Sequence, residues 1–560
     1  MFKGHPKGLI VAFFANMGER FGFYTMMAIL VLFLQAKFGL SAANAGYIYS
    51  TFYFLIYFLA LFGGFMADRV AGLNKTISLG ILVMAIGYIL MAVPGLGLAL
   101  TCFGLFIIAF GNGLFKGNLQ AVVGNLYEAP EYSHLRDRAF SLFYMGINVG
   151  AIFAPATAVG VRDWFLKTQG LKYDAHLPEM AHKIIDGAAP SAEFLEKASM
   201  VSGQTISADG AVQFAQHYID AFAKGFNMAF GVAAISMLAS LVIYMTCKKF
   251  LQPGMTVNAP AKKGDSKKVA DEMPASVVKE RIMALVFVFL VVIFFWMSFH
   301  QNGLTLTIFA KNYTQLTDIG RGTAFLFNVW ALVSAAIGLG GIVYACSKGI
   351  SVVKRIIGVV VGCIGAYLAY IQFEQFSTGD NQIAPEVFQQ FNPIFVVVLT
   401  PVVVGFFAYL AKKGKEPSAP RKIGIGMVIA AIGFVVMAIG SMFYHQLLPA
   451  GLHGASNTAF ASPYLLVSTY LILTIAELFL SPMGISFVSK VAPPKYKGMM
   501  QGGWLCATAL GNQLLFVGTT MWEVFSEVWM VWAIFIVCCL ISATVMFSMM
   551  KKLERVTNDC

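Results

Sequence analysis

Five ionisable side chains lie within otherwise apolar stretches of this chain, and their types define the chemistry available there. They are Glu19, Arg20, Lys116, His300 and Glu477. An ionised group at the centre of a bilayer costs about 2.5–3.5 kcal/mol even on the mildest scale, so such groups normally face a water-filled path. Two acids, two bases and one imidazole therefore predict a site that binds a charged solute and transfers protons.

The composition indicates that these groups belong to a membrane protein. Of the 560 residues, 58% are apolar and only 12% are charged, whereas soluble proteins carry about 25% charged residues. The net charge of +12 comes mostly from bases between apolar stretches, which favours membrane topology over nucleic-acid binding. The eight cysteines include no CxxC pair, so we expect no disulfide framework and no metal site.

Stretches long enough to cross a bilayer, about 20 apolar residues, recur along the whole chain. We predict fourteen spans near 8–35, 44–67, 76–94, 98–127, 139–160, 221–247, 282–311, 322–346, 352–373, 391–411, 422–446, 461–489, 498–521 and 527–550. The first is too long for the core of a signal peptide and is expected to remain in the mature protein. The fold class is therefore all-α.

Basic residues concentrate in alternate loops and set the expected orientation. The bases on one side are Arg69, Lys75, Arg136, Arg138, eight residues between Lys248 and Arg281, Lys348, Lys354, Arg355, Lys412, Lys413, Lys415, Arg421, Lys422, Lys490, Lys495, Lys497, Lys551, Lys552 and Arg555. The opposite loop at 374–391 contains three acids and no base. The positive-inside rule therefore predicts cytoplasmic termini, a cytoplasmic linker at 249–280 and an external loop at 161–220.

Several long motifs together carry a family resemblance. They are Asn16-Met-Gly-Glu-Arg-Phe-Gly-Phe-Tyr24, Gly63-Gly-Phe-Met-Ala-Asp-Arg69, Gly111-Asn-Gly-Leu-Phe-Lys-Gly-Asn118, Phe140-Ser-Leu-Phe-Tyr-Met-Gly-Ile-Asn-Val-Gly-Ala151, Phe391-Asn-Pro-Ile-Phe395, Glu477-Leu-Phe-Leu-Ser-Pro-Met-Gly484 and Lys497-Gly-Met-Met-Gln-Gly-Gly-Trp504. On these residues the chain resembles the proton-dependent oligopeptide transporter (POT or PTR) family of the major facilitator superfamily, as a divergent member.

The resemblance implies two six-helix bundles, residues 1–248 and 281–560, around a central site with alternating access. It also implies import of di- and tripeptides with protons as the coupling ion, no other cofactor, and action as a monomer in the cytoplasmic (inner) membrane. A helix pair at about 322–373 is additional, and its position after the seventh span departs from the usual family placement.

The resemblance also assigns proton coupling and gating. Proton coupling is expected to involve Glu19, Arg20 and Lys116, with His300 at the position where the family usually has an acid. His300 has two open interpretations, a substitute proton carrier or a neutral histidine hydrogen-bonded between helices. Gly64, Asp68 and Arg69 match a motif in which small residues allow close helix packing and the charge pair latches the cytoplasmic side.

Substrate binding is expected from positions in both halves. The matching residues are Arg20, Tyr24, Tyr57, Lys116, Asn148, Trp296, Asn392, Glu477, Trp504 and Thr508. Glu477 would hold the amino group of a peptide, and Arg20 with Lys116 its carboxylate. Helix capping by Asn392 and simple packing by the aromatic residues remain alternatives.

Three departures from the family pattern keep a second function open. Asn16 replaces a family glutamate, His300 stands where the family usually has an acid, and Met27 replaces a second arginine. Fewer acids favour an anionic solute such as nitrate or a carboxylate, with altered or absent proton coupling, whereas Glu477 would repel an anion. A non-transporting receptor is a third possibility. An enzyme is not expected, because we find no nucleophile–base pair, metal motif or phosphate loop.

Overall fold

The computed structural model describes residues 2, 4–255, 274–347, 349–444, 460–493 and 496–558. Within these ranges the chain is helical, and its extended pairing consists of isolated bridges between Thr314 and Ala461 and between Ile319 and Asn381. The predicted all-α class is confirmed. Most of the predicted linker at 249–280 and the end of the predicted span at 422–446 lie outside the described residues.

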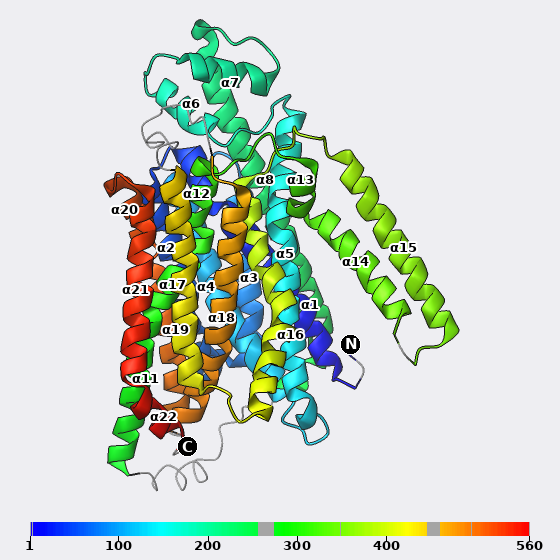
Figure 1. Ribbon diagram of the computed structural model, residues 1–560, viewed down its shortest axis with the longest axis vertical. Coiled ribbons are helices and arrows are strands. Elements are labelled where there is room, and N and C mark those ends of the chain that lie inside the picture. The colour runs from blue at the N-terminus through cyan, green and yellow to red at the C-terminus, as the bar shows by residue number, and fades with distance from the viewer. Residues whose placement is uncertain are drawn as a thin grey trace.

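The long helices stand side by side in one bundle, and the two termini lie toward the end opposite α6 and α7 (Figure 1). The helices that precede the linker, here called the N-terminal half, are α1 (Lys7–Phe38), α2 (Ala42–Met66), α3 (Gly72–Ala92), α4 (Leu98–Asn125), α5 (Arg136–Thr168) and α8 (Ala211–Cys247). Helix α1 packs against both α5 and α8. It is buried along most of its length, as expected for a helix that is apolar on every side.

Local sequence signals set the helix boundaries here. Helix α1 ends at Gly39, which adopts φ +64° and donates its N–H to the Gln35 carbonyl. Glycine adopts this left-handed conformation without a steric penalty. Ser41 then caps α2, because its Oγ accepts a hydrogen bond of 3.2 Å from the Asn44 N–H. The two signals together produce a turn of a few residues between antiparallel helices.

The C-terminal half repeats the arrangement with two broken spans. Its helices are α11 (Ala275–Phe299), α12 (Thr305–Tyr313), α16 (Phe391–Lys412), α17 (Ala419–Tyr444), α18 (Pro463–Val491), α19 (Lys497–Gln513), α20 (Phe516–Val524), α21 (Val528–Ser548) and α22 (Met550–Asn558). A 3₁₀ turn, η5 (His300–Gly303), separates α11 from α12. His300 therefore begins the irregular segment of this span.

Short elements connect the spans. They are the π-helical turn η1 (Ala67–Ala71), the 3₁₀ turns η2 (Ser133–Leu135), η3 (Ala208–Gly210), η4 (Lys248–Phe250) and η6 (Pro385–Gln390), and helix α9 (Gln252–Met255). The halves meet where α2 packs against α19 and α20, and where α5 packs against α16 and η6. The division into domains stays a prediction.

The predicted count of fourteen spans is not confirmed. Within the described residues, 11 helical segments are long and apolar enough to cross a membrane, or up to 12 when the bent pair α13 (Arg321–Phe327) and α14 (Val329–Ala345) is taken as one. That pair turns by 86° at Asn328. The segment Ala42–Ala92 is counted once but contains both α2 and α3, while α19 and α20 are 17 and 9 residues long.

Two additions lie outside the bundle. Helices α6 (Leu177–Ile185) and α7 (Ala192–Ser202) form a cap at one end, from the segment predicted as an external loop (Figure 1). Helices α14 and α15 (Val352–Gln375) project away from the bundle as a hairpin (Figure 1). The hairpin packs through glycines, since a Cβ on Gly338 would lie 2.9 Å from the Ala366 nitrogen.

Candidate functional site

The first-span motif forms a buried ion pair. Glu19 and Arg20 are 1% and 4% exposed, and Arg20 donates from Nε and Nη2 to the two Glu19 carboxylate oxygens at 2.5 and 2.7 Å. Asn112 of α4 donates to Glu19 Oε1 at 2.6 Å, and the Arg20 guanidinium lies 4.9 Å from the centre of the Phe23 ring. Arg20 is thus neutralised within its own helix, in the bidentate geometry that arginine prefers.

Lys116 is the other base predicted here, and no ion pair to a described residue involves it. Its Nζ lies 4.1 Å from the centre of the Tyr57 ring and hydrogen-bonds to that residue. Lys116 also interacts electrostatically with Arg20 and Glu19. Because Glu19 is occupied by Arg20, Lys116 is available to bind an anionic group.

Glu477 of α18 supplies an anion in the opposite half. Its carboxylate accepts a hydrogen bond of 3.1 Å from Asn392 Nδ2, which also donates to Thr474 Oγ1 at 3.0 Å. Among the residues that the structure describes, no lysine or arginine forms an ion pair with Glu477. Asn392 is the second residue of α16, yet its side chain bonds to α18. The helix-capping alternative for Asn392 is therefore not the geometry observed.

Two tyrosines connect these charged groups. Tyr24 of α1 interacts electrostatically with Arg20 and Tyr57 in its own half and with Glu477 in the other. Tyr144 of α5 interacts with Tyr57 and Glu477. These interactions relate Arg20, Tyr24 and Tyr57 of the N-terminal half to Glu477 of the other half. Tyr144 lies within a recognised sequence motif but received no predicted role.

His300 is hydrogen-bonded between helices. Its Nδ1 lies 2.6 Å from Asn512 Oδ1 of α19, and its ring stacks on Trp296 with 4.9 Å between ring centres. Tyr53 of α2 contacts the other side, with 4.8 Å between ring centres, and Lys116 acts on His300 electrostatically. This geometry matches the interpretation of His300 as a histidine hydrogen-bonded between helices. Nε2 is then the nitrogen that could accept a proton, and the role of His300 as a proton carrier stays a prediction.

Other predicted positions make contacts within their own half. Asn148 donates to the Tyr144 carbonyl of its own helix at 3.1 Å, and Thr508 donates to the Trp504 carbonyl at 3.1 Å. Trp504 packs against Phe289, with 6.4 Å between ring centres. These contacts are within one half and do not by themselves place the residues beside the charges.

The predicted gating motif differs in detail. Gly63 packs directly against Gly113 of α4, whereas a Cβ on Gly64 would meet no atom within 4 Å. Close helix packing in this conformation is therefore due to Gly63, and the gating role of Gly64 stays a prediction. Asp68 and Arg69 are exposed, and no ion pair to another described residue involves them. In this conformation no such latch is formed within the described part of the chain.

One buried ion pair was missed by the sequence reasoning. Arg162 of α5 pairs with Glu386 of η6, and both side chains are fully buried. The Arg162 guanidinium also lies 3.7 Å from the centre of the Tyr173 ring, where burial raises the pKa of Tyr173. Both partners were assigned to loops, so no apolar context marked them. A signal did exist, since Arg162 lies two residues beyond the end of a predicted span.

The arrangement is suited to binding a dipolar solute rather than to covalent chemistry. Lys116 and Glu477 carry opposite charges in opposite halves, and Glu19 is shared between Arg20 and Asn112. Within the described ranges, no group of three or more His, Cys, Asp or Glu side chains could hold a metal ion.

Comparison with known proteins gives a consistent family. The model of the POT family matches residues 74–259 and 365–535. The chain is 28% identical to "Uncharacterized transporter YclF" of Bacillus subtilis (92% of this chain, 87% of that protein). It is 27% identical to "Peptide transporter YePEPT" of Yersinia enterocolitica (91% and 87%) and 23% identical to "Dipeptide and tripeptide permease B" of Xenorhabdus bovienii (91% and 86%).

Solved structures share the fold. A peptide transporter POT in complex with sulfate superposes with a TM-score of 0.66 at 22% identity, covering 99% of this chain and 96% of that one. A POT family transporter in complex with 5-aminolevulinic acid gives a TM-score of 0.66 at 20% identity, covering 100% and 98%. At this identity the superpositions show that the chain shares the fold of these transporters.

Proposed function

We propose, on the premise that this chain belongs to the POT family of membrane transporters, that it imports di- and tripeptides together with protons by alternating access. The observation that carries the proposal is the pair of uncompensated charges. Among described residues, neither Lys116 nor Glu477 has an ion-pair partner, and they belong to opposite halves of the bundle. A zwitterionic peptide would supply a carboxylate to the first and an ammonium group to the second.

The relatives favour a peptide over other dipolar solutes. Two of the curated relatives carry names that specify peptides or di- and tripeptides. A desolvated ammonium group requires a fixed anion, and the partly buried Glu477 carboxylate would supply one. Binding of both peptide ends would draw the two halves together, which is how a ligand favours a closed state in a two-state equilibrium.

Proton coupling is proposed to depend on competition for Glu19. Arg20 holds this carboxylate in the structure, while Lys116 acts on it at longer range. A proton on Glu19 would release Arg20 to bind the peptide carboxylate beside Lys116. His300, with Nε2 free of its contact to Asn512, is proposed as the second proton-accepting group.

The direction of transport follows from the proposed orientation. The loops rich in lysine and arginine favour placement of both termini in the cytoplasm and of the α6–α7 cap outside a cytoplasmic membrane. The Arg162–Glu386 pair joins α5 to η6 and would then close the outer side. We propose that this conformation is closed to the outside and that the protein acts as a monomer.

Uptake of labelled dialanine into proteoliposomes tests the proposal. An inward proton gradient should drive accumulation above equilibrium, and Glu477→Gln should abolish it. Glu374→Gln, at an exposed external acid, is the matched control and should transport normally. His300→Gln should abolish gradient-driven accumulation while peptide-for-peptide exchange persists, and His217→Gln, at an exposed histidine, should not.

An anionic solute remains the second candidate because Lys116 is an uncompensated cation and position 16 holds a neutral asparagine. Nitrate and a dicarboxylate, added in excess, should leave dialanine uptake unchanged if the peptide proposal holds. Uptake of labelled nitrate that survives Glu477→Gln, together with no dialanine uptake, would replace it.

A further inference from the structure

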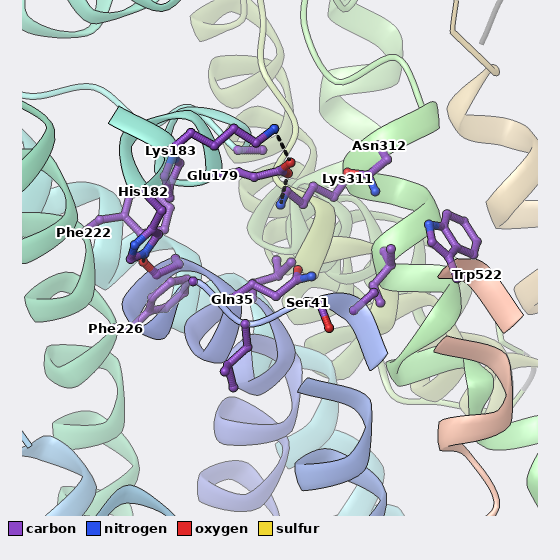
Figure 2. Close-up of a pocket in the computed structure, with 18 of the residues that line it drawn as sticks. Gln35, Ser41, Glu179, His182, Lys183, Phe222, Phe226, Lys311, Asn312 and Trp522 are labelled. Carbon is purple, nitrogen blue, oxygen red and sulfur yellow. Dashed lines mark hydrogen bonds and ion pairs between the residues drawn. The ribbon is translucent and has the colours of Figure 1, made fainter. Parts of the chain in front are cut away.

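A pocket with charged residues in its lining lies outside the contact network described above, beneath the cap. It has a volume of about 340 Å³ and lies where helix α6 meets α1, α2, α8, α12 and α20 (Figure 2). Both halves of the transporter therefore contribute to its lining. In the proposed orientation it faces the outside, where a solute arrives first.

Lys311 of α12 provides a poorly compensated cation in this pocket. The residue is only 7% exposed, and its Nζ lies 3.9 Å from Glu179 Oε2, beyond hydrogen-bonding distance. The same carboxylate accepts a hydrogen bond of 3.3 Å from Lys183, as Figure 2 shows. A buried ammonium group normally requires close anions and full hydrogen bonding. Among the described residues, the Lys311 ammonium group has one carboxylate at ion-pair distance, that of Glu179 at 3.9 Å, and no hydrogen bond to it.

Two other polar atoms at this pocket also lack partners. The Trp522 indole nitrogen and Gln35 Oε1 are buried, and neither has a hydrogen-bond partner in the described part of the chain. Trp522 as a whole is only 2% exposed. Such groups are rare in folded proteins, and each costs about 1–3 kcal/mol when left unsatisfied. A bound molecule with a carboxylate acceptor and an ammonium donor would satisfy both.

Glu179 is suited to exchange with such a molecule. Its side chain is 53% exposed, so it reaches water by a simple rotation away from Lys311. Burial alone would raise the pKa of Glu179, but the Lys311 and Lys183 ammonium groups hold it below its ordinary value. Glu179 is therefore ionised at neutral pH and competes with any other carboxylate for Lys311.

We infer that this pocket is an outer binding site for a small zwitterionic carboxylate, whose carboxylate binds Lys311 in place of Glu179. Asp186, which also lines the pocket, provides an anion for the ammonium group. The inference rests on the proposed function, because the ligand is the peptide to be transported. Since Glu179 joins the cap to the C-terminal half through Lys311, the incoming ligand would also release that contact.

Binding of dialanine to the full-length protein in lipid nanodiscs tests the inference. The Glu477→Gln background disables the central site, and calorimetry should then detect one remaining saturable phase. Lys311→Met should weaken that phase by about tenfold or more, as expected when the charged partner of a buried carboxylate is removed. Glu179→Gln should tighten it, because the competing carboxylate is gone. Lys224→Met, at an exposed lysine of α8 that pairs with Asp220 and does not line the pocket, should leave it within about twofold.

The outcomes separate the two proposals. If Glu477→Gln shows no remaining binding phase, or if Lys311→Met does not weaken that phase, the outer site is overturned. Dialanine uptake by the wild type would then leave the proposed function intact. Glu179→Gln separates two explanations. If the Lys311–Glu179 contact only supports the structure, Lys311→Met and Glu179→Gln should both weaken dialanine binding, whereas the proposed site predicts that Glu179→Gln tightens it. Absence of both dialanine uptake and dialanine binding in the wild type overturns the proposed function, and the outer site with it.

Discussion

The Arg162–Glu386 pair allows a quantitative test of how the two halves are joined. Both side chains are fully buried, and the pair links α5 of the N-terminal half to η6 of the C-terminal half. Arg162→Met leaves the buried Glu386 carboxylate without its partner, which costs about 3–5 kcal/mol. Glu386→Leu leaves the Arg162 guanidinium with its 2.9 Å hydrogen bond to the partly exposed Asp163 carboxylate. The double variant removes both fully buried charges and should cost less than Arg162→Met alone.

The structure gives a reason to expect this order. Arg162 Nη2 and Glu386 Oε2 have no hydrogen-bond partner among the described residues, so the pair is only partly satisfied. Methionine retains much of the apolar stem that packs beside Tyr173. The expected coupling free energy between the two positions is therefore at least about 2 kcal/mol, within the range for residues in contact.

Reversible unfolding in mixed micelles with increasing SDS measures the four free energies of the cycle. Arg421→Met is the matched control, because the Arg421 side chain is 55% exposed in its ion pair with Glu554. That change should cost no more than about 1 kcal/mol. If the two single costs simply add in the double variant to within about 0.5 kcal/mol, the pair is not a coupled link between the halves.

Two further predictions concern packing and pH. Gly63→Ala should destabilise the protein by about 1–3 kcal/mol, because the new methyl group meets the Gly113 backbone, whereas Gly64→Ala, which faces open space, should be neutral or stabilising in the same unfolding assay. If both variants behave alike, the assigned packing face of α2 is wrong. Burial, and to a smaller extent the Lys311 charge, lower the pKa of His176 from 6.5 to about 4. Lys197 lowers this pKa further, whereas Asp174 and Glu179 raise it. The native cap then binds fewer protons than the unfolded cap, so its stability is complete above pH 6.5 and declines as the pH falls toward 4. Hydrogen exchange in α6 should accelerate over that interval in the wild type but not in His176→Gln, and equal acceleration in both would contradict the assignment.

Much of the fold was predictable because hydropathy and sequence motifs can be recognised within short stretches of the chain. Apolar length and basic loops indicated the helices, and the motif residues indicated the family. The breaks were not predictable in this way. The turn of 86° at Asn328 and the separation of α19 from α20 lie within continuous apolar stretches, where hydropathy does not change. Their geometry depends on packing against other helices, which explains why fourteen spans were predicted and not confirmed.

The site was predictable in its charges but not in its pairings. Glu19, Arg20 and Glu477 stood out because lipid does not favour acids and bases within a span. Their partners depend on tertiary structure, since Asn112 reaches Glu19 from 93 residues away and Asn392 reaches Glu477 from 85 residues away. The arginine was therefore expected to be free for substrate, whereas the structure shows it bound to Glu19.

The sequence also could not show which of two adjacent glycines packs against a neighbouring helix. Gly63 and Gly64 are equally small, and only their angular positions on α2 decide which one faces α4. Arg162 and Glu386 lie 224 residues apart at the ends of different spans. Their pairing becomes visible only once both halves are assembled.

The central claim is that Lys116 and Glu477 hold opposite ends of one dipolar solute. The most direct test is the ratio of the Kd for N-acetyl-dialanine, which lacks the ammonium group, to the Kd for dialanine at the central site, measured in a Lys311→Met background. With Glu477 intact, this ratio should be about 30 or more, as expected for a charge pair formed in the complex. In the Lys311→Met/Glu477→Gln double variant, the two Kd values should differ by no more than about twofold. A ratio that is unchanged by Glu477→Gln, or equal weakening of both ligands, would contradict the claim.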